Sequence, residues 1–493
     1  MMKKILLFLI FAFLVSATKS GAQEIVKLTL DEAIELAEVQ SPNALMAKHT
    51  FRASYWQYRT FQAKYRPSLS LTGTAPDYST AYDKVWNSQF ERWDYKASNT
   101  ISNNAALSLT QNIGLTGGSI SLVSDLTMFN DFENDTRRFI TSPVSIGLNQ
   151  PLFKYNDLKW QKKTEPLKYE MARRTFLYNM ESVHQQTVSN FFSLAQAQIN
   201  YQMALINYAN ADTLWRISQG RYELGTIAED ELLQMQLTWL NAETARKQEE
   251  MNLRNSEIRM RSFLGFSDKV RLELVIPDEI PEIQVNIDEV FALAMKNNPE
   301  IISQELKILN AQSNVAQAKA DRGFNASLTA SFGLRDQDTD FLPAYRDPNQ
   351  QQRVRIGFTI PILDWGLGRG KYKMAQSGLE LAEVQSRQAI LDFQQNLSLD
   401  VEKFNLQATQ VKIAAKSDTV AQKMFEVTKQ RFLIGKIAVI ELNNADNKKD
   451  QNRRQYISSL QSYWNLYYNL RGLTLYDFVN RKPLETDYDK LVD

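Results

Sequence analysis

Residues 397–415 read LSLDVEKFNLQATQVKIAA, and their apolar positions recur at alternating steps of four and three. This spacing is typical of a coiled-coil seam, because residues three and four apart share one face of an α-helix. Any single residue of such a stripe indicates ordinary core packing. The stretch therefore predicts a long packed helix. Its seam positions are Leu397, Val401, Phe404, Ala408, Val411 and Ala415.

The same plan occurs 210 residues earlier in the chain. Residues 379–434 and 436–471 contain no Gly or Pro, the residues that end helices, and neither do residues 167–219 and 226–264. A 53-residue helix would extend roughly 80 Å, far longer than the helices of globular domains. Two long helical hairpins of one design are predicted. The earlier seam positions are Thr187, Phe191, Leu194, Gln198, Tyr201 and Leu205.

A second offset, 257 residues, relates the segments that precede the hairpins. Thr29 to Glu32 and Asn286 to Glu289 both have the pattern of a capping box. Helical candidates follow at 43–66 and 300–322, and each is succeeded by a strand pattern. The offset of 210 then resumes in the next strand. Val144, Ile146 and Leu148 thus correspond to Val354, Ile356 and Phe358.

The change of offset means that the first repeat carries 47 extra residues (257 − 210), between about Gly73 and Val144. Alternating Leu107 and Leu109, a Gly117-Gly118 pair, and alternating Ile120 and Leu122 predict an added β-hairpin there. The insert also contains a group of aromatic residues. These form an interfacial girdle, face outward near lipopolysaccharide, or pack within a loop. They are Tyr78, Tyr82, Trp86, Phe90, Trp93 and Tyr95.

Composition excludes several functional classes. The 57 Lys and Arg residues balance 56 Asp and Glu residues, which argues against a nucleic-acid partner. The absence of Cys removes disulfides, thiol catalysis and Cys-ligated metals. Only His49 and His184 are available for a His-built metal site or a catalytic triad. We therefore expect neither an enzyme nor a bound cofactor or metal.

The first 22 residues have the form of a secretory signal peptide. Lys3 and Lys4 precede an apolar run from Ile5 to Val15, and small residues lead to a cleavage site after Ala22. The apolar run is shorter than the roughly 20 residues that span a bilayer. The sequence thus predicts an exported chain.

The strand patterns distinguish between classes of exported protein. They are short, alternating and weakly hydrophobic, as lipid-facing barrel strands are. A soluble periplasmic coiled-coil scaffold or adaptor would share the hairpins but would not need such strands. Four strands per chain, or six with the added hairpin, fall short of the roughly eight that close the smallest barrels. Several identical chains are therefore expected to close one barrel together.

In this combination of features the chain resembles the TolC-like outer membrane efflux proteins. The resemblance rests on the duplicated element order, the tip motifs Arg221 to Gly225 and Arg431 to Gly435, and the strand ends Gln150 to Phe153 and Ile360 to Gly366. It implies an α+β membrane protein: an internally duplicated protomer of a trimeric, 12-stranded outer-membrane β-barrel, continued by a long periplasmic α-helical coiled-coil barrel. Four strands would come from each chain.

The implied function is that of an exit duct in a tripartite efflux pump. The implied partners are two further copies in a homotrimer, outer-membrane lipid, a periplasmic adaptor (membrane fusion protein) and an inner-membrane transporter of RND or ABC type. A duct for type I protein secretion is the alternative within this class, and the soluble scaffold is the alternative outside it. The resemblance also places the adaptor contacts at the helical tips. These residues are Arg221, Gly225, Thr226, Arg431, Gly435 and Lys436.

The resemblance further implies an acidic ring at the periplasmic entrance. The matching positions are Glu441 and Asn444, of which only the first is charged, and Glu231 is the equivalent in the first repeat. Where the pattern has an Arg and a Tyr that hold the entrance shut, this chain has Ile437 and Phe432. We therefore hypothesise a hydrophobic latch at these two residues.

Thr226 and Glu229 suggest a capping box after the first tip. Two further motifs look like functional sites but are better explained as parts of the fold. Glu181 and His184 have the spacing of a di-iron ligand pair but lack a second pair, so His184 is expected on a helix surface. Gly366, Gly368 and Gly370 are mis-spaced for a phosphate loop and indicate a hinge.

The predicted division of the chain is 1–22 signal peptide, 23–66 first short helices, 67–153 first strands with the insert, 154–275 first long hairpin, 276–323 linker and second short helices, 324–363 second strands, 364–480 second long hairpin and 481–493 tail.

Overall fold

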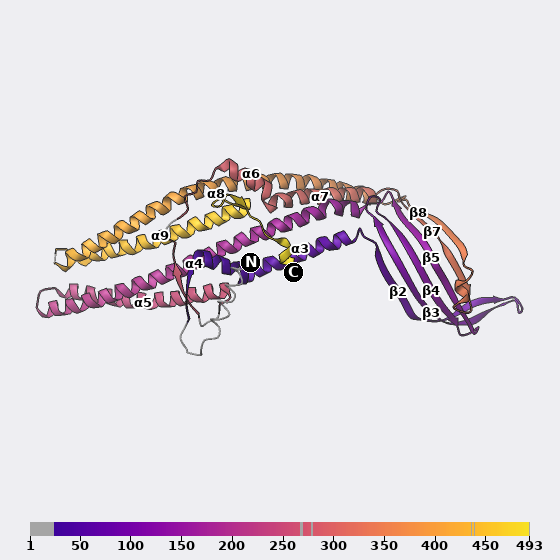
Figure 1. Ribbon diagram of the computed structural model, residues 1–493, viewed down its shortest axis with the longest axis horizontal. Helices are drawn as coiled ribbons and strands as arrows, with labels where there is room; N and C mark the ends of the chain where they lie inside the picture. The colour runs from indigo at the N-terminus through magenta and orange to yellow at the C-terminus, as the bar shows by residue number, and fades with distance from the viewer. Residues whose placement is uncertain (1–23, 267–269, 278–279, 435, 438, 493) are drawn as a thin grey trace, which may run out of the picture. The chain divides into compact units, whose positions relative to one another are not determined.

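The computed structural model describes residues 24–266, 270–277, 280–434, 436–437 and 439–492 (Figure 1). The predicted signal peptide lies outside these residues. The chain divides into two compact units. The helical unit comprises the residues up to 50, 176–298 and 395–487, and the sheet unit comprises 51–175, 299–394 and the residues from 488.

Two long helical hairpins are present, with element bounds that repeat at the offset of 210 residues. The first pairs α4 (Asp157–Glu223, 67 residues) with α5 (Glu229–Leu264, 36 residues). The second pairs α8 (Leu367–Leu433, 67 residues) with α9 (Val439–Thr474, 36 residues). α4 is longer than predicted because it runs through Pro166. A proline within a helix costs about 3 kcal/mol, which packing along so long a helix outweighs.

The predicted seams are buried over part of their length in the helical unit, while Gln198, Tyr201, Leu205, Ala408 and Ala415 are half-buried. Leu397, Val401 and Phe404 are at most 2% exposed, and Phe191 and Leu194 are fully buried. These positions fix which face of each long helix packs inward, as the heptad spacing requires.

Shorter helices precede each strand set: α2 (Leu30–Gln40), α3 (Pro42–Ala63), α6 (Ile287–Asn297) and α7 (Pro299–Asp321). The capping box of Thr29 and Glu32 forms. At the second site the Asn286 side chain accepts from the backbone N–H of Asp288 instead, so the predicted box with Glu289 is wrong. None of the described helices is both long and apolar enough to cross a membrane.

Sequence reasoning missed a small parallel sheet in the helical unit. Its strands are β1 (Glu24–Thr29) and β6 (Val270–Val275), which pair along their full length. The C-terminal segment forms the short pair β9 (Tyr476–Asp477) and β10 (Lys482–Pro483), followed by α10 (Tyr488–Val492).

The sheet unit is organised around one antiparallel sheet of six strands, in the order β2-β3-β4-β5-β7-β8 (Figure 1). Four strands come from the first repeat and two from the second, which also contains a short 3₁₀ helix (Pro343–Tyr345). The strands are β2 (Ser68–Asn87), β3 (Arg92–Ile113), β4 (Gly118–Asp131), β5 (Thr136–Leu152), β7 (Asn325–Asp338) and β8 (Asn349–Thr359).

The insert forms the predicted hairpin, which consists of β3 and β4. Its turn is closed by the Gly117 N–H, which donates to the Ile113 carbonyl at 2.8 Å, and Gly117 takes the left-handed φ of 74°. Segments inserted between two antiparallel strands must leave and return, so they add strands in pairs. The sheet of one chain therefore has six strands, the larger of the two counts expected from the sequence, whereas the resemblance implies four.

Candidate functional site

The six-stranded sheet has one apolar face. Its register places Leu69, Leu109, Leu122, Ile146 and Phe332 in one row across five strands. These side chains are 38–66% exposed. Because side chains alternate between the faces of a strand, the next row lies on the opposite face and is polar. That row is Ser68, Thr110, Ser121, Gly147, Ser331 and Arg353.

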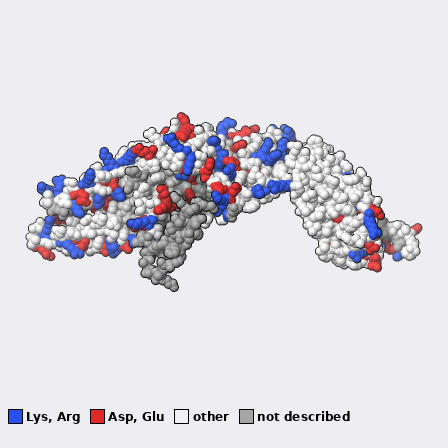
Figure 2. All heavy atoms as spheres, in the orientation of Figure 1, with Lys and Arg blue, Asp and Glu red and all other residues white. Residues whose placement is uncertain are grey.

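Charge is also distributed unevenly along the strands. Segments 68–76, 97–113, 118–124, 139–152 and 325–334 contain no Lys, Arg, Asp or Glu. In Figure 2 the visible charges of the sheet gather towards one end of its strands, whereas the helices carry charges throughout. Ten residues of a strand tilted by about 40° rise roughly 26 Å, which is the height of a lipid-facing band.

A bulge in β2 brings the predicted aromatic residues onto the apolar face. Thr74 pairs with Asn104 and Asp77 with Ser102, so β2 contains one extra residue there. The extra residue moves the apolar-face positions of β2 from odd to even numbers. The aromatic residues therefore follow strands instead of packing within a loop, except Phe90 in the turn. Those on the apolar face are Tyr78, Tyr82, Trp86, Trp93 and Tyr95.

At the first helical tip, Gly225 ends α4 in a left-handed conformation with a φ of 70°. The Gly225 N–H donates to the Tyr222 carbonyl and the Thr226 N–H to the Arg221 carbonyl, both at 2.9 Å. This is a Schellman motif. The Thr226 hydroxyl donates to the Arg221 carbonyl at 2.8 Å and does not cap α5, whose N-cap is Ala228. The predicted capping box of Thr226 and Glu229 is therefore wrong, because the Thr226 hydroxyl is bonded within the turn at the end of α4.

The second tip has the corresponding backbone bond. The Lys436 N–H donates to the Arg431 carbonyl at 3.0 Å, the equivalent of the Thr226 bond 210 residues earlier. Gly435 lies outside the described residues. Arg221, Arg431 and Lys436 are all exposed, so both tips present cationic side chains to solvent.

The predicted entrance residues lie next to these tips. Glu441 and Asn444 are exposed and three residues apart on α9, so they share one face of the helix. Glu231 is exposed in the first turn of α5. Ile437 lies in the turn that connects α8 to α9, and it is half-buried.

Phe432 belongs to an apolar cluster that joins the two hairpins. It packs against buried Phe425, Leu442 and Ala445, as does Leu214 from α4. Nearby, the side-chain amide of Asn207 on α4 donates to Asp450 on α9 at 2.9 Å. Sequence reasoning missed Leu214, Asn207 and Asp450, because residues on a helix do not indicate which distant helix they contact.

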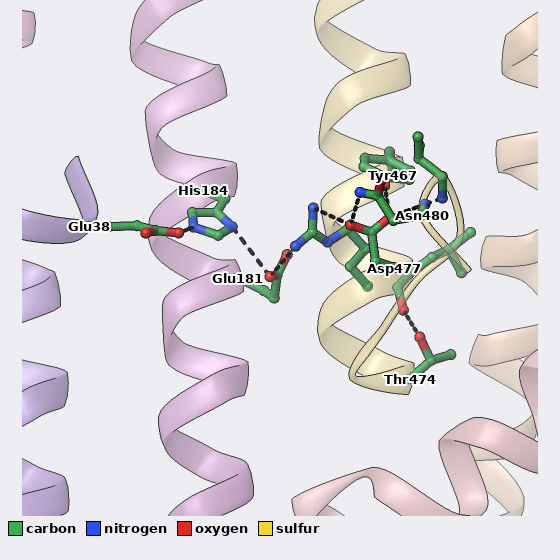
Figure 3. Close-up of polar contacts among 10 residues, drawn as sticks. Glu38, Glu181, His184, Tyr467, Thr474, Asp477 and Asn480 are labelled. Atoms are coloured by element: carbon green, nitrogen blue, oxygen red, sulfur yellow. Dashed lines mark hydrogen bonds and ion pairs between the residues drawn. The ribbon is translucent and has the colours of Figure 1, made fainter. Parts of the chain in front are cut away.

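A buried polar cluster lies deeper in the helical unit and is drawn in Figure 3. Arg471 donates to Glu181 at 3.0 Å and lies 3.7 Å from Asp477. The Glu181 and Asp477 side chains are 3% and 7% exposed. Asp477 also accepts from the Tyr467 hydroxyl at 2.9 Å. Arg471 thereby joins α9 to α4 and to the C-terminal segment.

His184 extends this cluster and is buried, which contradicts the expectation of a surface residue. Its Nε2 is 2.7 Å from Glu38 of α2, and its Nδ1 is 3.3 Å from Glu181. Burial alone would lower the pKa of His184, but the two carboxylates outweigh it and raise the pKa to about 8. Within the described ranges, no group of three His, Asp or Glu side chains could hold a metal ion.

The predicted hinge at the start of α8 is a helix cap. Asp364 accepts from the N–H groups of Gly366 and Gly368, at 2.9 and 2.8 Å. These backbone bonds lower the pKa of Asp364. The glycines thus serve a capped helix start and no phosphate site.

A sheet whose strands contain long uncharged stretches, with one apolar face and one polar face lined mainly by hydroxyls, has the pattern of strands that lie between lipid and water. Residues 290–474, which contain β7, β8 and the whole second hairpin, match the family model described as "Outer membrane efflux protein". This region therefore matches the outer membrane efflux proteins, which confirms the resemblance predicted from the sequence. No curated protein sequence matches the chain significantly.

Solved structures extend the similarity to nearly the whole chain. The Campylobacter jejuni CmeC outer membrane channel has a TM-score of 0.66 at 15% identity, over 94% of this chain and 88% of that one. The outer membrane protein VceC from Vibrio cholerae has a TM-score of 0.60 at 12% identity, over 92% of this chain and 97% of that one. The open state of the Neisseria gonorrhoeae MtrE channel has a TM-score of 0.58 at 11% identity, over 93% of this chain and 91% of that one. This chain has the fold of those channels.

Proposed function

We propose that three copies of the chain form a passive channel across the outer membrane, the exit duct of a tripartite efflux pump. The observation that carries the proposal is the two-faced sheet in a chain with the fold of outer membrane channels. The apolar face, represented by Leu122 and Ile146, contacts lipid. The hydroxyl-lined face contacts the water-filled lumen.

In this proposal the helical unit lies in the periplasm and receives substrates from an inner-membrane transporter of RND or ABC type through a periplasmic adaptor. Its hairpins follow one plan because the chain arose by internal duplication, in agreement with helix bounds 210 residues apart. The duct performs no chemistry of its own. Energy for transport comes from the pump.

The tips are proposed to dock the adaptor. A Cβ placed on Gly225 would meet no heavy atom within 4 Å, so the backbone there is open to a partner. The first tip also presents exposed Arg221, the second tip presents exposed Arg431 and Lys436, and Thr226 and Gly435 complete the proposed docking residues.

The entrance is proposed to be ringed by Glu441, one from each copy, with Asn444 and Glu231 nearby. A ring of carboxylates favours cations. Phe432 and Ile437 form the hydrophobic latch that holds the entrance shut. Phe432 supports this role through its cluster with Leu214, which ties the second hairpin to the first.

The first test is the protein mass of the detergent-extracted particle by light scattering, with bound detergent subtracted. Three chains with a detergent belt are expected. A water-soluble particle without a belt would refute the membrane channel and favour a periplasmic scaffold.

The second test compares cells that have and lack the chain. Loss is expected to increase the accumulation of a fluorescent efflux dye. If dye accumulation were unchanged and a secreted protein were lost from the medium, the proposed function would be type I protein secretion and not drug efflux.

A further inference from the structure

We propose that β2 of one copy pairs with β8 of the next, so that every copy contributes all six strands, the β3–β4 hairpin included, to the barrel wall. The proposed trimer then has an 18-stranded barrel. This inference rests on the proposed channel function and specifies the surface through which the copies meet.

The two strands are the open ends of the sheet. Within the described chain, β2 pairs only with β3, and β8 only with β7. Their outer edges therefore carry backbone N–H and C=O groups without a neighbouring strand. In a bilayer each such unsatisfied group costs several kcal/mol, so an open edge cannot face lipid.

The directions of the two edge strands are suited to each other. All neighbouring strands of the sheet are antiparallel, and six is an even number. β2 and β8 consequently run in opposite directions. When copies are arranged around an axis, β8 of one meets β2 of the next as another antiparallel pair, and the alternation continues without a break.

The side chains of the edges indicate a missing neighbour. Leu71 on β2 and Val354 on β8 are 74% and 72% exposed, whereas Leu109 on inner β3 is 38% exposed. Edge strands that face water are protected by Lys, Pro or short length. β2 contains Pro76 and Lys84 further along, but residues 68–75 of β2 and residues 354–359 of β8 contain neither Lys nor Pro. A second copy of the same sheet would continue the apolar face across this boundary.

The added hairpin is a fixed part of the sheet. β3 and β4 pair without a register shift from Ile113 and Gly118 at the turn to Thr100 and Asp131. β4 in turn pairs with β5, so the hairpin separates β2 from β5. The β3–β4 hairpin cannot leave the barrel wall without breaking the hydrogen bonds of the β2–β3 and β4–β5 pairs.

Side chains also attach the turn of this hairpin to the neighbouring helices. Gln111 donates to the Tyr65 carbonyl at 3.0 Å, just after α3. Asn156, just before α4, donates to the carbonyls of Gly114 and Leu115 at 3.1 Å. The Tyr65 hydroxyl still reaches the Leu158 carbonyl at 2.7 Å, so α3 and α4 remain joined. The hairpin therefore widens the strand layer without separating these helices.

Disulfide cross-linking tests the pairing, because the chain has no native Cys. Ser70→Cys on β2 is combined in turn with Cys at Arg353, Arg355, Gly357 or Thr359, which share its face on β8. Oxidation in membranes is expected to give cross-linked trimers from at least one pair, and a reducing agent should return them to single chains. Scanning four positions covers the stagger between copies.

Two matched pairs complete the design. Ser70→Cys with Ser108→Cys joins residues whose hydroxyls are 2.9 Å apart in one chain, so it should give only an intrachain link. Ser70→Cys with Ser145→Cys on β5 should give none, because β3 and β4 lie between them. A β2–β5 link, or no β2–β8 link in a detergent-belted trimer, overturns the inference and leaves the channel standing. A particle without a belt overturns the channel and the inference together.

Discussion

Arg471 is the residue on which the buried polar cluster depends. Its guanidinium pairs with Glu181 and Asp477, which are almost fully buried. Removing one partner of a buried ion pair leaves an uncompensated charge and typically costs 3–5 kcal/mol. We expect Arg471→Met to lower the free energy of unfolding by about 3 kcal/mol, measured by thermal unfolding in detergent. Lys27→Met, which removes the exposed Lys27–Glu273 pair, should cost less than about 1 kcal/mol. Equal costs would show that the cluster contributes nothing beyond a surface pair.

His184 makes stability depend on pH in a defined direction. Its pKa in the folded chain, about 8, is above the value of about 6.5 in an unfolded chain. The stabilisation is therefore complete below pH 6.5 and is lost as the pH rises through 8. The shift corresponds to about 2 kcal/mol. We expect His184→Gln to remove this decrease between pH 6 and pH 9 in thermal unfolding. His49→Gln, at the exposed second histidine, should keep it, and the prediction fails if both variants retain the native pH profile.

At this scale the sequence predicted local features and failed for distant ones. Gly225 was placed correctly because a lone Gly between two long helices is a local signal for a left-handed turn. His184 was misplaced because its partner Glu38 lies 146 residues away. Burial by a remote helix leaves no trace in the neighbouring residues.

At the first helical tip, substitutions of Gly225 separate the effect of the left-handed backbone from the effect of side-chain size on adaptor docking. Asn tolerates a left-handed φ, so Gly225→Asn should keep both the turn and adaptor docking. Gly225→Trp also has open space at its Cβ, but a bulky residue at this left-handed φ costs roughly 1–2 kcal/mol of backbone energy. We expect Gly225→Trp alone to abolish efflux at an unchanged level of outer-membrane trimer. Normal efflux by Gly225→Trp would exclude close docking at this tip. The same result is expected for Gly435→Trp.

The contact between the hairpins predicts how the entrance opens. Phe432→Ser removes an apolar side chain from the cluster with Leu214 and Phe425. The closed state should lose about 2–3 kcal/mol of this contact, so single-channel recordings in planar bilayers are expected to show more frequent or larger openings. Ile440→Ser, at a 65% exposed position of the same tip, is the control. Equal conductance of both variants and the native channel would exclude the latch.

Element bounds followed from the positions of Gly and Pro, but pairings did not. The sequence predicted α3 and α7 closely, because Pro42 and Pro299 begin these helices. It also predicted the strands around Leu107 and Ile120. It could not show that these strands join the main sheet instead of projecting from it, since strand order depends on contacts between distant segments.

For the whole molecule, the added hairpin determines the width of the proposed barrel. At a strand spacing of about 4.8 Å and a tilt of about 40°, eighteen strands give a diameter of about 36 Å and twelve give about 24 Å. Deleting residues 88–131 would join β2 to β5 through residues 132–135 and leave four strands in each chain. Electron-microscopic projections of the deletion variant should therefore show the barrel narrowed by about one third. The helical tube in the same particles is the internal control and should keep its diameter, because α3 and α4 contact each other directly through the stacked rings of Tyr58 and Tyr169. An unchanged barrel would mean that the hairpin lies outside the wall in the native channel.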